Sequence, residues 1–181
     1  ADALSWCSDA GASYKSRLSF AAAGLEPQIA APHAPSNSGA VGEYRGVKID
    51  QAYVGSCVGA KLSDLHMVVE VLRGRSVKSG TRLLVAPAST RVMAEAAADG
   101  TLATITAAGG ILLPTGCGAC AALGAGILAE DEVCVSTTNR NFKGRMGANS
   151  ASVYLGSPYS VAAAAVAGEL VDPRELLGVP A

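Results

Sequence analysis

The clearest pattern in the chain begins near residue 41, where short apolar runs alternate with stretches of helical spacing. Short apolar runs predict buried strands, and apolar residues that recur every three or four positions predict amphipathic helices. By this rule we expect strands at 49–54, 82–87, 111–113, 133–136 and 153–155. Helices are expected at 62–72, 90–98, 101–108 and 160–170.

This alternation of strands and helices favours the α/β class, as a three-layer α/β/α domain with a mainly parallel sheet. In such sheets, ligands bind at the loops that follow the carboxyl ends of the strands. Three predicted strands are followed by chemically reactive residues: Cys57 after the first, Cys117 and Cys120 after another, and Asn139 and Arg140 after a third. We therefore expect these residues to converge at one edge of the sheet.

The first forty residues differ from the rest of the chain. Prolines at 27, 32 and 35 favour an extended path. We interpret residues 1–40 as an N-terminal connector or edge piece and residues 41–181 as one domain. A length of 181 residues suits a single core of this kind.

Composition and charge narrow the possible functions. Half of the residues are hydrophobic but only 4% are aromatic, so small aliphatic side chains should build the core. The net charge of -1 and the lack of a long basic run argue against nucleic-acid binding. The uncharged stretch 100–129 is interrupted by Pro114 and by glycines, which argues against a membrane span. Residues 1–12 lack the pattern of a signal peptide, and five cysteines are an odd number, so we expect a cytoplasmic protein without a disulfide framework.

Three cysteines lie in glycine-rich turns, at 55–59 and 115–120. Glycine lets the backbone bend tightly and direct N–H groups toward negatively charged sulfur. Electron-transfer clusters usually have four cysteine ligands, whereas three leave one iron open for Lewis-acid chemistry. A zinc site and an inert buried set remain alternatives at this point. We interpret Cys7 and Cys134 as ordinary small residues outside the site.

A dense polar segment occupies residues 137–145 and contains Arg140 and Arg145. The planar guanidinium group suits bidentate binding of carboxylates. The segment could therefore bind a di- or tricarboxylate, or it could be a solvated surface loop whose arginines form ordinary ion pairs.

Taken together, the motifs resemble the third, iron–sulfur domain of the aconitase and isopropylmalate dehydratase superfamily, in the form found in large subunits of isopropylmalate dehydratase and homoaconitase. The resemblance rests on Val-Gly-Ser-Cys at 54–57, Gly-Cys-Gly-Ala-Cys at 116–120 and Thr-Thr-Asn-Arg-Asn-Phe-Lys-Gly-Arg at 137–145. Further matches lie at 25–28, 49–53 and 154–158, so the resemblance covers nearly the whole chain.

The resemblance implies that Cys57, Cys117 and Cys120 ligate a 4Fe-4S cluster, which is converted to a 3Fe-4S form or lost when the open iron leaves. It places Asn139 beside the cluster and gives Arg140 and Arg145 the task of binding or orienting a substrate carboxylate. The implied activity is that of a hydro-lyase or isomerase, which dehydrates and rehydrates a small hydroxy acid. The catalytic base would come from elsewhere, because the family carries it on a separate swivelling domain.

Several positions depart from the family pattern. Val58 and Gly59 stand where Thr-Asn is usual, Ala119 replaces a proline, and Ala121-Ala122 replace Leu-Gly. These changes imply an unusual substrate or an altered cluster environment. The chain is also short for the family, so we expect partner chains that supply aconitase-like domains 1 and 2 and a small swivelling subunit. The alternative is a non-catalytic, degenerate subunit that only holds a cluster.

Overall fold

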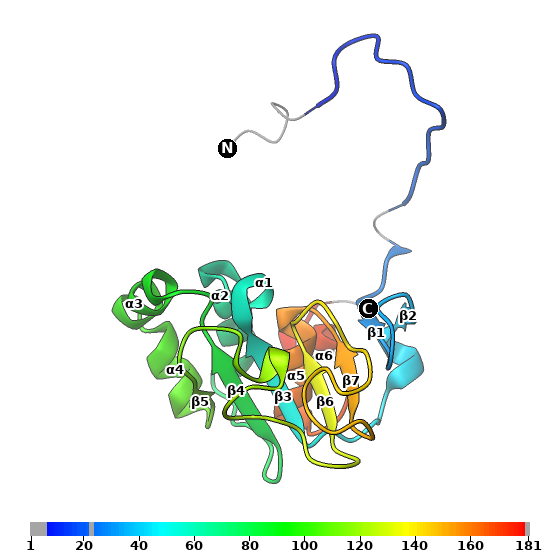
Figure 1. Cartoon of the computed structure of the whole chain (residues 1–181). Helices are drawn as coiled ribbons and strands as arrows, with labels where there is room; N and C mark the ends of the chain where they lie inside the picture. The colour runs from blue at the N-terminus through cyan, green and yellow to red at the C-terminus, as the bar shows by residue number, and fades with distance from the viewer. Residues whose placement is uncertain (1–6, 22–23, 180–181) are drawn as a thin grey trace.

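A mixed sheet of seven strands, in the order β2-β1-β7-β6-β3-β4-β5, forms the centre of the protein (Figure 1). The structure is a computed structural model, and it describes residues 7–21 and 24–179. The strands are β1 (Gln28–Ala30), β2 (Ser38–Ala40), β3 (Gln51–Gly55), β4 (Arg82–Ala86), β5 (Ile111–Leu112), β6 (Val133–Ser136) and β7 (Ser152–Leu155). The α-helices are α1 (Ser56–Gly59), α2 (Leu62–Leu72), α3 (Thr90–Ala98), α4 (Thr101–Ala107), α5 (Pro158–Ala167) and α6 (Pro173–Leu177). Two 3-10 helices are η3 (Val41–Tyr44) and η4 (Gly118–Ala121).

The five strands from β3 to β7 run parallel to one another. β3 pairs with β4 on one side and β6 on the other, and β5 and β7 extend the sheet outward. Only β1 and β2 run antiparallel to their neighbours within the described residues. The carboxyl ends of β3, β4, β5, β6 and β7 therefore meet at one edge. The predicted α/β class with a mainly parallel sheet is confirmed.

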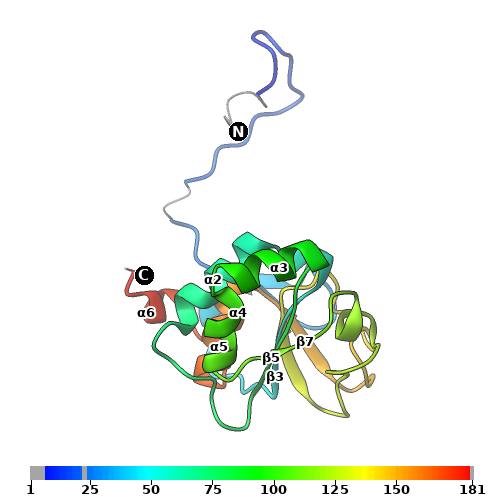
Figure 2. The same ribbon diagram turned by 90° about the vertical axis from the view of Figure 1, so that its left-hand side faces the viewer.

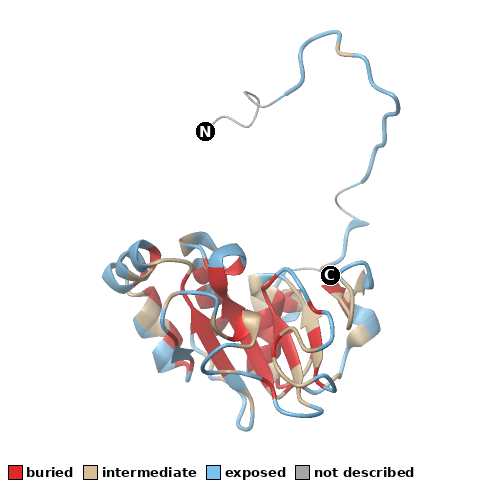
Figure 3. Cartoon of the chain, in the orientation of Figure 1, coloured by how far each residue is buried: buried red, intermediate tan, exposed pale blue. Residues whose placement is uncertain are grey.

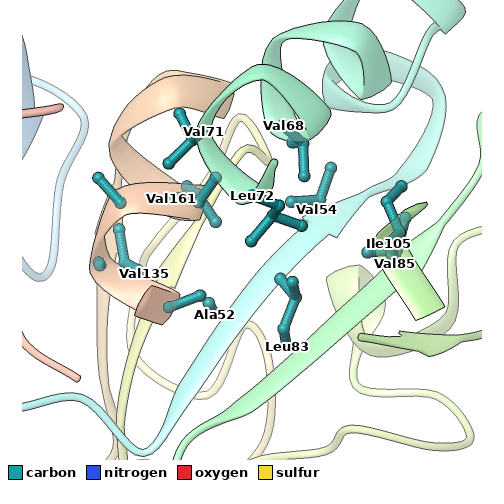
Figure 4. Packing of buried hydrophobic residues seen from close by; sticks show 14 of the residues in the cluster. Ala52, Val54, Val68, Val71, Leu72, Leu83, Val85, Ile105, Val135 and Val161 are labelled. Atoms are coloured by element: carbon teal, nitrogen blue, oxygen red, sulfur yellow. The ribbon is translucent and has the colours of Figure 1, made fainter. Parts of the chain in front are cut away.

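One face of the sheet is covered by helices α2, α4 and α5 (Figure 2). Strand residues at alternate positions, such as Val54 and Val85, point into this layer and share a buried cluster with Leu72 of α2 (Figure 4). Alternation follows from the two-residue period of a strand. Full burial of each Val or Leu side chain contributes about 1.5–3 kcal/mol to folding. The larger of the two buried clusters therefore lies between the sheet and this helical layer. Figure 3 shows the central strands as buried.

The opposite face carries the alternate residues, including Tyr53, Leu84 and Cys134. It is covered by η4 and by the loops that join β5 to β6 and β6 to β7, which contribute Leu128 and Met146 to a second buried cluster. The third layer of the domain therefore consists of one short helix and two long loops. These loops follow the strands that end at the carboxyl edge.

Most predicted elements lie within two residues of the observed ones, but the last long helix is displaced. It was predicted at 160–170 and instead begins at Pro158 and ends at Ala167. The side chain of Ser157 accepts a hydrogen bond from the Ser160 backbone N–H, and proline suits the first helical turn. Gly168 has a φ of +77° and terminates the helix.

The N-terminal part divides into two pieces. Residues 7–21 run as an exposed segment that leaves the domain (Figure 1). β1 and β2 then pair with each other, and β1 pairs with β7, which extends the sheet beyond its parallel part. The domain boundary at residue 41 stays a prediction.

In the described ranges, none of the helices has both the length and the apolar character that crossing a bilayer requires.

A hydrogen bond between side chains joins two parts of the helical layer. Nε2 of His66 on α2 lies 2.8 Å from Oδ2 of Asp99, which follows α3, and the other carboxylate oxygen accepts from the Thr101 backbone N–H at 2.9 Å. The hydrogen bond with His66, and after it those with Thr101, lower the pKa of Asp99 from 3.8 to about 2. Because the carboxylate is favoured in the folded state, its contribution to stability is complete above pH 3.8 and disappears as the pH falls toward 2.

We therefore expect Asp99→Asn to lower the melting temperature at neutral pH and to leave it unchanged near pH 2. The measurement is thermal unfolding of both proteins as a function of pH. Low salt is used because salt screens the interactions of an exposed charge such as the Asp99 carboxylate. A difference between the two proteins that stays constant down to pH 2 would contradict this assignment.

Candidate functional site

The carboxyl edge of the sheet gathers the polar and sulfur-bearing residues singled out in the sequence. Cys57 follows β3, Cys117 and Cys120 follow β5, and Asn139 and Arg140 follow β6. Because β3 lies between β6 and β4, and β4 pairs with β5, all three strand ends belong to one continuous parallel section. The predicted convergence of these loops at one sheet edge is therefore observed.

Cys57 lies in the single helical turn α1, directly after β3, and is exposed. Gly55 forms the corner between strand and turn, where there is no room for a side chain. A Cβ atom at Gly55 would lie 2.4 Å from the ring of Tyr53. The small residue thus allows the chain to turn over the tyrosine ring and present Cys57 at the edge.

Cys117 and Cys120 lie at the start and within η4, and the backbone N–H of Cys120 donates to the carbonyl oxygen of Cys117 at 3.0 Å. Cys117 is exposed, whereas Cys120 is buried. Gly116 and Gly118 both have positive φ values, of +138° and +46°, which glycine adopts without strain. The two thiols therefore sit one helical turn apart in a tight loop.

Tyr53 of β3 contacts both cysteine turns. Its ring packs under Gly55, and its hydroxyl group donates to the carbonyl oxygen of Cys117 at 3.4 Å. Burial raises the pKa of Tyr53 to about 12, so the hydroxyl remains a neutral donor. The sequence marked Tyr53 only as part of a family match, although strand alternation would have placed it on the loop face.

Arg145 lies closer to the cysteines than the sequence indicated. Its Nη2 atom is 3.5 Å from the sulfur of Cys120, and its guanidinium carbon lies 5.6 Å from the centre of the Phe142 ring. Its Nε atom is buried and has no hydrogen-bond partner among the described residues. The Arg145 guanidinium group therefore lies between the sulfur of Cys120 and the ring of Phe142.

The remaining residues of the Asn-Arg segment point in different directions. Asn139 and Arg140 are exposed, and Nη1 of Arg140 donates to the carbonyl oxygen of Asn139 at 2.7 Å. Asn141 is fully buried and donates to the carbonyl oxygens of Ala31 and Val153 at 2.8 and 3.1 Å. Asn141 therefore anchors the loop to β1 and β7, a role that no periodic signal in the sequence revealed.

The donors that these turns offer are thiols, the ligands that iron–sulfur clusters use. Among residues 7–21 and 24–179, no three His, Cys, Asp or Glu side chains gather closely enough to hold one metal ion. A zinc ion would need its thiolates at about 2.3 Å from one point. A cubane cluster instead binds each thiolate at a different corner. The loop also leaves space, since a Cβ atom added at Gly116 would have no heavy atom within 4 Å.

An apolar cavity of about 250 Å³ lies beside the second cysteine turn. The carboxyl ends of β4 and β5 and the loop after η4 form its walls, which include Leu113, Gly118 and Leu123. The exposed residues Val58 and Phe142 add further apolar surface near the two turns. The site thus combines three thiols and two arginines with an apolar surrounding.

Comparison of the sequence with known proteins assigns the chain to a family. The model of the aconitase family (aconitate hydratase) matches residues 40–168, which contain all three cysteines and both arginines of the site. The large subunit 1 of 3-isopropylmalate dehydratase from Deinococcus radiodurans is 47% identical over 173 residues, which make up 96% of this chain and 40% of the relative. The homoaconitase large subunit of Thermus thermophilus is 46% identical over 168 residues, 93% of this chain and 40% of the relative.

A third relative gives the same coverage. The large subunit 2 of 3-isopropylmalate dehydratase from Archaeoglobus fulgidus is 44% identical over 169 residues, 93% of this chain and 41% of the relative. The chain thus spans about two fifths of the length of these curated relatives. The family model covers most of the chain, and the expected resemblance is confirmed: the chain belongs to the aconitase family.

Proposed function

We propose that this chain is the cluster-bearing part of a hydro-lyase that dehydrates and rehydrates a small hydroxy acid. The observation that carries the proposal is that the loop with Cys57 and the loop with Cys117 and Cys120 both start at the carboxyl edge of the sheet, with Nη2 of Arg145 3.5 Å from the sulfur of Cys120. Membership in the aconitase family and relatives named as dehydratase and homoaconitase large subunits support the reaction class.

In this proposal, the three thiolates hold a 4Fe-4S cluster. Such a cluster, with one iron free of protein ligands, supplies a Lewis acid that assists departure of a hydroxyl group. The exposed thiols of Cys57 and Cys117 face solvent, whereas buried Cys120 lies against Arg145. The guanidinium group of Arg145 would offset part of the negative charge that a cluster on Cys120 brings to this buried position.

Arg140 and Asn139 are the groups available to a substrate. Both are exposed on the loop after β6, and the Arg140 guanidinium has donors left after its bond to the Asn139 carbonyl. A carboxylate bound in bidentate fashion by Arg140 would be held in a fixed orientation beside the thiols. The apolar cavity near Leu123 would accept an aliphatic part of the same molecule.

Partner polypeptide completes the site in this proposal. The relatives are named large subunits, and the chain matches about two fifths of their length. We expect aconitase-like domains 1 and 2 and a small swivelling subunit to supply the base and the rest of the pocket. Size-exclusion chromatography of the native complex tests this, and an active monomer of this chain alone would contradict it. A cytoplasmic location stays a prediction.

The cluster is tested by anaerobic purification or reconstitution, followed by iron and sulfide analysis and EPR after mild oxidation. About four irons and four sulfides per chain are expected, with a three-iron signal on oxidation, because one iron lacks a thiolate and leaves first. Stoichiometric zinc, or no metal in an intact anaerobic sample, would instead favour the degenerate structural subunit.

Substrate binding by Arg140 is tested with Arg140→Lys in the assembled enzyme. Lysine keeps the positive charge but loses the planar fork, so kcat/KM should fall about tenfold or more, the equivalent of one charge-assisted hydrogen bond. Unfolding should be unchanged because the side chain is exposed. Wild-type kinetics would assign Arg140 to the solvated surface. Lys143→Arg, at an exposed position on the same loop, is the matched control.

A further inference from the structure

The turn that carries Cys57 is held by a neighbouring strand end and not only by its own helical bonds. The backbone N–H of Thr137, directly after β6, donates to the carbonyl oxygen of Tyr53 at 3.0 Å and continues the ladder between β3 and β6. Thr137 is therefore fixed beside the point where β3 passes into α1. Its side chain is buried, with 5% of the residue exposed.

The hydroxyl group of Thr137 contacts both ends of the Cys57 turn. It accepts a hydrogen bond from the backbone N–H of Gly55 at 3.0 Å, before the cysteine. Its own hydrogen is directed to the carbonyl oxygen of Gly59 at 2.9 Å, after the cysteine, with the carbonyl of Gly55 at 3.3 Å as a second acceptor. One side chain thus spans the two residues that flank the Ser56–Val58 segment.

Close packing supports these hydrogen bonds. A Cβ atom at Gly59 would lie 2.3 Å from the carbonyl oxygen and from the hydroxyl oxygen of Thr137. Thr137 can therefore approach the turn this closely only because Gly59 has no side chain. α1 is a single turn whose first residue has no side-chain cap, so the turn has few other local restraints.

From this geometry we propose that Thr137 is a positioning residue that fixes the Cys57 turn, and through it the direction of the Cys57 thiol. The part of the proposal that concerns cluster retention rests on the proposed function. A hydroxyl at residue 137 satisfies a buried N–H and a buried carbonyl at once, and its loss leaves both without their partner. Cys57 would then keep its identity as a ligand but lose its fixed orientation.

The test compares Thr137→Val, which keeps the shape but removes the hydroxyl, with Thr137→Ser, which keeps the hydroxyl. Thr138→Val is the matched control, because Thr138 is also buried on this loop but its hydroxyl bonds to Ser136 at 3.0 Å and not to α1. The first readout is amide hydrogen exchange of the cluster-free full chain. The second is the rate at which a chelator removes iron from the reconstituted protein in the absence of oxygen.

Thr137→Val is expected to speed exchange of the amides at 55–59 about tenfold, the effect of losing one buried hydrogen bond, while peptides from α2 and α5 exchange as in the wild type. Iron loss should accelerate by a similar factor. Thr137→Ser should show the wild-type rates of both amide exchange and iron loss. Unchanged exchange at 55–59, or equal acceleration in Thr138→Val, would overturn the positioning role.

The two readouts separate the two proposals. Faster exchange in a protein that never binds a cluster would overturn the proposed function and leave the role of Thr137 in the turn supported. Faster exchange with wild-type iron retention would overturn the link between the turn and the cluster. If Thr137→Val fails to fold, its amides will lose protection from exchange throughout the chain. The comparison of Thr137→Ser with the wild type then decides whether the hydroxyl group fixes the turn.

Discussion

Cys120→Ser is expected to abolish cluster binding, with iron and sulfide falling from about four per chain to background. A serine oxygen is a hard, weakly acidic donor and does not replace a thiolate that is held in a buried position beside Arg145. The measurement is metal and sulfide content after anaerobic reconstitution, with the absorbance of the cluster as a second signal. Activity of the assembled enzyme should be lost in parallel.

Cys134→Ser is the matched control, because it makes the same change at another buried cysteine. Cys134 lies within β6, and its sulfur donates to the Val135 carbonyl oxygen at 3.5 Å. Burial raises the pKa of Cys134 to about 12, so this thiol stays protonated and is unsuited to ligate iron. The variant should keep its cluster. Loss of iron from Cys134→Ser together with retention in Cys57→Ser would show that the ligand set is wrong.

Gly59→Ala is expected to destabilise the protein by about 1–3 kcal/mol, the usual range for an atom forced into a filled space. The added methyl group would lie 2.3 Å from the backbone oxygen of Thr137, and a backbone atom within a sheet edge has little freedom to move away. Because the strain falls on the Cys57 turn, cluster content should fall as well. Chemical unfolding of the cluster-free protein measures the first effect separately from the second.

The control for this prediction is Gly42→Ala in η3, where an added Cβ atom would have no heavy atom within 4 Å. Its effect should stay within about 0.5 kcal/mol. Equal stability of the Gly59 and Gly42 variants would mean that the Cys57 turn can shift at little energetic cost.

The close packing at Gly59 also concerns the position where the family pattern has asparagine. An asparagine in place of Gly59 would require the turn to move.

The parallel part of the sheet was predictable because strands that are buried on both faces consist of uninterrupted apolar residues. Runs such as Leu83–Ala86 are apolar throughout, and the helix at Leu62–Leu72 shows its buried positions at helical spacing. β1 and β2 gave no such signal. Each has three residues. They pair with each other, and β1 is fixed by its pairing with β7 and by the anchor at Asn141, which are contacts between distant parts of the chain.

The meeting of three loops at one edge of the sheet was predictable, whereas the contacts within those loops were not. Parallel strands share a direction, so the loops that carry Cys57, Cys117 and Arg140 were expected at the same edge. The roles of Tyr53 and Thr137 depend on which face of a strand is covered by which loop. Spacing carries no information on that choice, since the loop layer lacks a repeating pattern and buries single residues such as Leu128 and Met146 at irregular intervals.

The loop layer has a consequence for how such a site can diverge in evolution. The same two loops shield one face of the sheet and present the reactive edge, so many of their residues are selected for packing as well as for chemistry. Substitutions are therefore least costly at the outward positions of these loops, such as Leu123 and Phe142, which are 60% and 50% exposed. New substrate preferences should accumulate there first, while inward neighbours such as Asn141 and Met146 remain fixed by the cost of uncovering the sheet.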